Sequence, residues 1–130
     1  MKNNNPLRLR HTGDITQGLT PQQTDPQYLQ FRSLVYGYRA AFVTIRNLVW
    51  ISRRDTLDRV LTYWAPDAAG ADSLLYTARV CALTGFSPGD EVNPLDVCHM
   101  VPLVAAISRI ENGRPPRVSD IMAGWRLYQG

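Results

Sequence analysis

One apolar stripe near the C-terminal end of the chain constrains the fold more than any other feature. Its members recur every three or four residues, which is the spacing of one helix face. They are Val97, Val101, Val104, Ile107 and Ser108. Asn112-Gly113 and then Pro115-Pro116 follow, and these residue types end a helix. The pattern therefore predicts an amphipathic helix that ends at Glu111.

The same kind of periodicity predicts further helices, and with them a mainly α fold of about five helices. Residues 1–30 are polar and interrupted by proline and glycine, so we expect an irregular N-terminal arm in front of a helical core over 34–130. Asn93 and Pro94 fit the start of the helix that ends at Glu111, and Pro102 predicts a kink there or two helices in sequence. The first two expected helices cover 34–52 and 55–64, and Asp55 caps the second. The third is capped by Asp72 or Ser73 and ends at Thr84. The fourth covers 93–111, and the last is capped by Ser119.

Length and composition limit the classes of protein to consider. The chain has 130 residues, the size of one domain, with 45% hydrophobic and 19% charged residues, a balance typical of a globular protein. All basic residues except Lys2 are arginines, and the net charge is +3. These arginines are scattered along the chain, so a dedicated nucleic-acid surface is not indicated.

Metal, cofactor and membrane sites find no support in the sequence. Cys81 and Cys98 stand apart in apolar helical patterns, which favours buried free thiols, with a single disulfide as the alternative. His11 and His99 are isolated, so we expect neither a metal site nor a cofactor. No apolar signal segment or membrane span is recognised, so we expect synthesis in the cytoplasm. Release would then depend on lysis, a virion or a dedicated secretion machine.

Glu111 is the strongest candidate for chemistry. It shares a helix face with the apolar stripe and meets the negative end of the helix dipole. Desolvation and the dipole both favour the protonated carboxyl, and a carboxyl group that stays neutral near pH 7 can act as a general acid. The alternative is an exposed carboxylate paired with Arg114 or Arg117, and the sequence leaves both interpretations open.

Three segments together resemble small lysozyme-like proteins of phages and prophages. Asn5-Pro6-Leu7-Arg8-Leu9-Arg10 is similar to an Asn-Pro-x-Asn-Ile-Arg opening in that family. Phe31, the run Tyr36-Gly37-Tyr38-Arg39-Ala40, Trp64-Ala65-Pro66 and Tyr76 follow in the family's order and approximate spacing. The Glu-Asn-Gly of 111–113 resembles the family's terminal signature.

The resemblance implies a circularly permuted lysozyme or glucosaminidase domain that cuts peptidoglycan or another glycan. Glu111 would be its catalytic acid, and Asn5, Pro6 and Arg10 would lie beside it in space. The implied substrate-binding residues are Asn5, Arg10, Tyr36 and Tyr38.

The same resemblance admits a non-catalytic interpretation. Arg8 stands where the family has Asn, the loop over 68–72 lacks an Asn-Thr pair, and 11–18 lacks a Trp. The alternative is therefore a phage or prophage structural or interaction protein, with partners in a virion or a secretion machine. A second carboxylate, which most glycosidases need, could come only from Asp14 or Asp25. Each of these is more typical of a turn.

Overall fold

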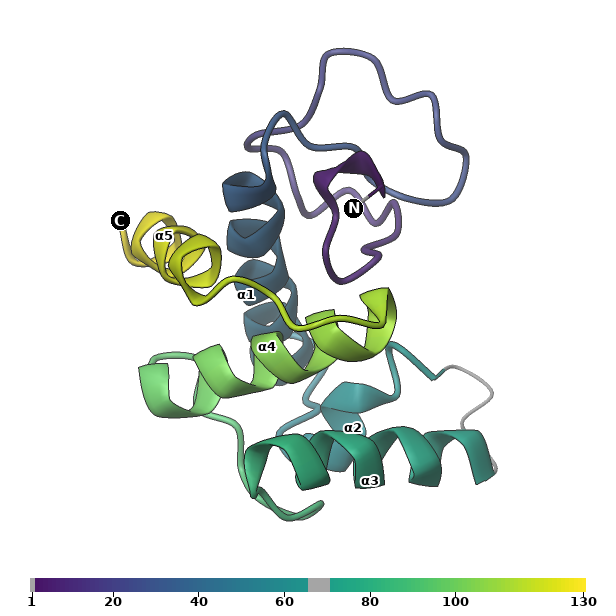
Figure 1. The fold of residues 1–130 in the computed structure, drawn as a ribbon, viewed down its shortest axis with the longest axis vertical. Coiled ribbons are helices and arrows are strands. Elements are labelled where there is room, and N and C mark those ends of the chain that lie inside the picture. The colour runs from purple at the N-terminus through teal and green to yellow at the C-terminus, as the bar shows by residue number, and fades with distance from the viewer. Residues whose placement is uncertain (1, 66–70) are drawn as a thin grey trace.

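The computed structural model describes residues 2–65 and 71–130 and confirms a mainly α fold (Figure 1). A short 3-10 helix, η1 (Lys2–Asn4), opens the chain. No strand forms within these two ranges, where only isolated bridges join extended segments. Five α-helices follow: α1 (Leu34–Trp50), α2 (Leu57–Leu61), α3 (Ala71–Thr84), α4 (Val97–Asn112) and α5 (Val118–Gln129).

Helix α1 is the centre of the molecule, with α5, α4 and the arm packed around it (Figure 1). Ser33 caps it by accepting a hydrogen bond from the Tyr36 N–H, and serine is a favoured residue at this position. α5 lies close to α1 because Gly124 has no side chain: a Cβ there would come within 2.6 Å of the Tyr38 Cβ. Phe42 and Trp125 then meet edge to face across this interface at 5.1 Å.

The N-terminal arm contributes more to the core than its polar sequence suggests. Arg10 pairs with Tyr28 and Leu19 with Phe31 in isolated bridges, which fold the arm back on itself. The Trp64 indole N–H donates to the Leu7 carbonyl at 2.7 Å and ties the arm to the segment after α2. The buried apolar residues of the arm and its end are Leu7, Leu9, Ile15, Leu29 and Phe31.

Several predicted helix starts are wrong. α4 begins at Val97, where the Asp96 carboxylate accepts from the Cys98 N–H at 2.8 Å. Asn93 instead accepts from the Leu95 N–H in a local turn, so the Asn-Pro signal marks that turn. Pro102 lies within one continuous α4 rather than between two helices.

The remaining boundaries differ by a few residues. α2 ends at Leu61 instead of continuing to Trp64, and Thr56 rather than Asp55 is its N-cap. Asp72 and Ser73 lie inside α3, and Ser119 lies inside α5. The predicted loop over 67–72 and the Pro66 break lie mostly outside the described residues.

Both cysteines are free thiols, but the expectation of burial was wrong: Cys81 is half-buried and Cys98 is exposed. None of the described helices is long and apolar enough to cross a membrane.

Candidate functional site

Glu111 occupies the last turn of α4, as the sequence predicts. Gly113 ends the helix with a left-handed backbone (φ 72°) and donates its N–H to the Arg109 carbonyl at 2.8 Å. Ile107 and Ser108, one turn earlier, are almost completely buried, and Glu111 itself is half-buried. The carboxyl group therefore lies at the edge of the core, next to the negative end of the helix dipole.

Burial raises the pKa of Glu111 above its ordinary value. The Tyr76 hydroxyl opposes this shift, because it donates a hydrogen bond to Glu111 Oε2 at 3.0 Å and thus favours the charged form. The positive charges of Arg8, Arg10 and Arg79 act in the same direction as Tyr76. Desolvation is the largest cause, so the net shift is upward.

No ion pair within 4.0 Å joins Glu111 to an arginine in the described part of the chain. The alternative of a simple surface pair with Arg114 or Arg117 therefore has no support from the geometry. A half-buried acid with a raised pKa and a phenol donor can hold a proton and release it to an acceptor nearby.

The N-terminal arm approaches the end of α4 (Figure 1). The Asn112 amide donates to the Pro6 carbonyl at 2.8 Å and to the Ser108 carbonyl at 2.7 Å. This joins residues 106 positions apart in the sequence. The geometry thus brings the arm beside Glu111, which is the arrangement that the family resemblance implies.

Arg10 is held rigidly near Glu111. Its guanidinium lies 4.0 Å from the Tyr63 ring centroid and donates to the Tyr63 carbonyl at 2.8 Å. Its backbone N–H donates to the Tyr63 hydroxyl at 2.9 Å. Since its charge also acts on Glu111, Arg10 is a fixed cation of the candidate site.

A polar cavity of about 320 Å³ opens between the arm and the end of α4. Arg8 links this cavity to Glu111, because its charge acts on that carboxyl group while its side chain lines the cavity wall. Arg8 is exposed and has a left-handed backbone (φ 51°), a conformation that turns the arm at this point. The lining residues are Lys2, Asn3, Asn5, Arg8, Tyr28 and Asn112.

Asn5 reaches this cavity, but its side chain is mostly engaged inside the protein. Its carbonyl oxygen accepts from the Leu9 N–H at 2.8 Å, and its amide donates to the carbonyls of Leu9 at 2.9 Å and Leu29 at 3.0 Å. Only 3% of Asn5 is exposed. Its evident task is to shape the arm that carries Arg8 and Arg10.

The two predicted tyrosines do not gather at the site. Tyr38 is fully buried, and its hydroxyl is hydrogen-bonded to Ser108 at 2.9 Å. The expectation that Tyr38 touches a substrate is therefore corrected: it packs α1 against α4. Tyr36 is half-buried and packs on Gly18, where any side chain would overlap its ring.

Among residues 2–65 and 71–130 no carboxylate acts on Glu111, whose pKa there responds to burial, Tyr76 and arginines. Asp25 accepts the N–H groups of Gln27 and Tyr28 and the Asn3 amide, so it is a turn residue with a lowered pKa. Asp14 is exposed. Within the described ranges no three metal-ligating side chains converge on one point.

Sequence reasoning missed Tyr76 and Arg79 as members of the site. They are three residues apart on α3 and so share one face of that helix. This spacing could have grouped the two residues, but it could not show which element the face meets. Asn112, which joins the arm to α4, was predicted only as a helix-ending residue and as part of the Glu-Asn-Gly signature.

Comparison with known proteins relates the chain to a phage protein. No family model matches it. It is 26% identical over 134 residues to "Protein P5" of Pseudoalteromonas phage PM2, in an alignment that covers 98% of this chain and 81% of that protein. The predicted likeness to phage proteins is therefore supported, while the lysozyme-like part of that prediction gains nothing from this relative.

Proposed function

We propose that this protein cleaves the glycan strands of peptidoglycan with Glu111 as general acid. The observation that carries the proposal is a half-buried carboxyl group with a raised pKa, free of any ion pair in the described part of the chain. The adjacent polar cavity, about 320 Å³ in volume, offers space for sugar hydroxyl and amide groups.

In this mechanism Glu111 donates its proton to the glycosidic oxygen as the bond from the anomeric carbon to that oxygen breaks. Such proton transfer contributes roughly 10²–10⁴-fold to the rate. Tyr76 orients the carboxyl group through its 3.0 Å hydrogen bond. Arg8 and Arg10 supply positive charge for polar or anionic groups of the glycan.

In the described part of the chain no carboxylate acts on Glu111, which favours a route in which the substrate supplies the attacking group. The N-acetyl oxygen or the 6-hydroxyl of the sugar can attack the anomeric carbon as the glycosidic bond breaks. The first route yields a reducing sugar after water hydrolyses a cyclic intermediate. The second yields a 1,6-anhydro sugar, and the Glu111 carboxylate takes up the proton that the 6-hydroxyl loses. Either route needs a single protein acid.

The test is release of soluble fragments from purified peptidoglycan, followed by turbidity and identified by mass spectrometry. We expect Glu111→Gln to lower the rate at least about 10²-fold, since an amide cannot donate the proton. Glu91→Gln is the matched control, because Glu91 is the only other glutamate and is exposed. A Glu111→Gln variant that clears walls as fast as the parent would remove the catalytic role.

A second candidate function is a non-catalytic structural protein of a phage particle. The similarity to a phage protein favours it, and so does the burial of Tyr38 and Asn5, which leaves fewer groups for a glycan. Under this proposal the parent releases no fragments from any peptidoglycan. Mass spectrometry of purified, nuclease-treated virions should then detect the chain at a fixed copy number.

A further inference from the structure

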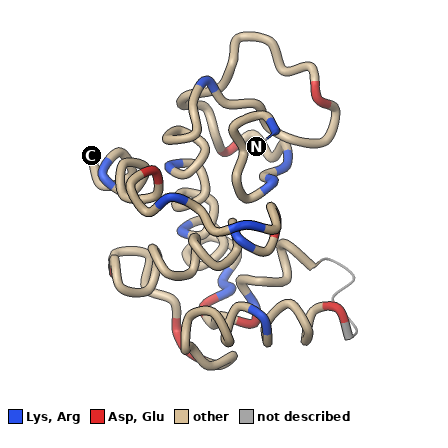
Figure 2. The backbone as a smooth tube through the Cα atoms, viewed as in Figure 1, with Lys and Arg blue, Asp and Glu red and all other residues tan. Residues whose placement is uncertain are grey.

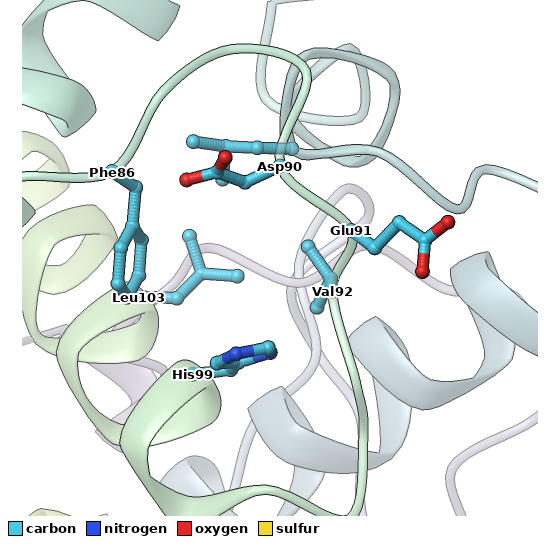
Figure 3. A pocket seen from close by; sticks show the side chains of 7 residues that line it. Phe86, Asp90, Glu91, Val92, His99 and Leu103 are labelled. Carbon is cyan, nitrogen blue, oxygen red and sulfur yellow. The ribbon is translucent and has the colours of Figure 1, made fainter.

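A second cavity, of about 270 Å³, lies between α2, the start of α4 and the connector over 86–92, apart from the Glu111 site (Figure 3). The connector runs beside the start of α2: Leu57 N–H donates to the Asp90 carbonyl at 2.9 Å, and Val92 N–H donates to the Asp55 carbonyl at 3.0 Å. The cavity is lined by Leu57, Phe86, Asp90, Glu91, Val92, His99 and Leu103.

The body of this cavity is apolar. Leu57, Val92 and Leu103 form aliphatic walls and are nearly or fully buried. Phe86 and His99 add two rings that meet edge to face, with centroids 6.2 Å apart. At roughly 30 Å³ for each water of liquid volume, the space is that of about nine waters, or a ligand of about ten non-hydrogen atoms. Apolar walls of this kind favour an apolar ligand body.

Asp90 gives the cavity its charge. One carboxylate oxygen, Oδ2, accepts from the Ser87 N–H at 2.8 Å. Asp90 forms no ion pair with the described basic residues. Figure 3 shows its carboxylate directed across the cavity toward Phe86, whereas the neighbouring carboxylate of Glu91 points away.

Other acidic residues approach the connector that carries Asp90, although the chain as a whole carries +3. The bridge between Thr56 and Glu91 brings Asp58 and Asp55 alongside the connector. Of this group only Asp55 pairs with an arginine, Arg59, at 3.3 Å. Figure 2 shows acidic residues beside basic ones in this lower part of the molecule, so the charge that faces the cavity is that of Asp90 itself.

The cation that fits here is organic rather than a metal ion. Across the described residues no three candidate ligands surround one point. His99 is already committed, because its Nδ1 accepts the Asn93 N–H at 3.1 Å and its Nε2 lies 3.6 Å from the Asp96 carboxylate. Among the described residues, the Asp90 carboxylate is thus an unpaired charge directed across an apolar space.

We infer that this cavity binds a small organic ammonium, with its apolar body between Phe86 and Leu103 and its ammonium group on Asp90. The free oxygen of Asp90 accepts a hydrogen bond from the ammonium, and the aromatic ring of Phe86 contacts the body of the ligand. This site is independent of the Glu111 proposal.

The experiment is an NMR titration of the ¹⁵N-labelled full chain with phenethylammonium and, separately, with its neutral isostere 2-phenylethanol. Phenethylammonium is expected to shift the amides of 86–92 and His99 in a saturable way and to bind about fivefold or more tightly than the alcohol. Asp90→Asn should reduce the affinity for phenethylammonium to that for the alcohol. The asparagine keeps an acceptor for the Ser87 N–H, so the connector retains its turn.

Asp14→Asn is the matched control, because it makes the same change at an exposed aspartate of the N-terminal arm that does not line the cavity. Its affinity for phenethylammonium should stay within about twofold of the parent, because the removed charge lies outside the cavity. A capped lysine is a third probe that separates two sources of the ammonium group. If it binds more tightly than phenethylammonium, the ammonium is assigned to a lysine side chain of a partner protein. If it binds more weakly, the ammonium is assigned to a free small amine. Equal binding of phenethylammonium and 2-phenylethanol, equal effects of the two variants, or no saturation with phenethylammonium would overturn the inference.

Discussion

Replacement of Asn5 by alanine tests whether the arm beside Glu111 depends on one buried amide. Asn5 makes three hydrogen bonds to the backbone, two with Leu9 and one with Leu29, all between 2.8 and 3.0 Å. These bonds close the loop that carries Arg8 and Arg10 toward Glu111. With 3% of Asn5 exposed, water cannot readily replace the lost partners.

The expected loss follows from the fate of each partner. The Leu9 carbonyl keeps a bond, because it also accepts from the Leu29 N–H at 3.0 Å. The Leu9 N–H and the Leu29 carbonyl lose their bond with Asn5. Net contributions of about 1 kcal/mol for each of the three bonds give about 3 kcal/mol. This is a large share of the roughly 5–15 kcal/mol by which a domain is usually stable.

Urea unfolding followed by tryptophan fluorescence measures this loss. With a slope of about 2 kcal/mol per molar urea, the midpoint of Asn5→Ala should fall by about 1.5 M. Gln17→Ala is the control in the same arm, because Gln17 is exposed, and its stability should change by less than about 0.5 kcal/mol. A loss below about 1 kcal/mol in Asn5→Ala would refute the structural role of this side chain.

Three further outcomes are expected. Gly37→Ala should lower stability by about 2–3 kcal/mol, because its Cβ would overlap the Asn4 carbonyl oxygen. Gly89→Ala should leave stability unchanged, because its Cβ would lie in open space. Equal thermal midpoints for the two variants would contradict this expectation. Tyr76→Phe should raise the pKa of Glu111 further in an NMR titration, since the lost hydrogen bond favours the charged form; an unchanged pKa would count against it. The folded state holds the Glu111 proton more tightly than the unfolded state, so stability should fall as pH rises from about 4.3 to the raised pKa. Chemical denaturation at several pH values measures this slope, and Glu111→Gln should remove it.

The sequence predicted the helices because their apolar residues follow a local period. The core of α1 and the end of α4 are where the spacing and the Asn112-Gly113 stop place them. Helix starts were less predictable, because polar residues offer competing caps. Asn93 forms a local turn while Asp96 caps α4, and both residue types suit either role.

The site was predictable only in part, for a physical reason. The position of Glu111 on an apolar face is a property of one helix and can be read from its spacing. Its contact with Tyr76 depends on how α3 packs against α4, which local periodicity does not reveal. The burial of Tyr38 likewise follows from the close approach of α5 at Gly124. The buried residues of the arm have no regular period, so the arm appeared less anchored than it is.

The central claim is that burial keeps Glu111 protonated beyond the range of an ordinary glutamate, and an NMR titration of its side-chain carboxyl carbon measures this directly. The Glu111→Gln spectrum identifies the signal by its disappearance. The account predicts a midpoint clearly above the ordinary value of about 4.3. A midpoint at or below that value would mean that Tyr76 and the arginines outweigh burial, and Glu111 would then be a charged structural residue rather than a proton donor.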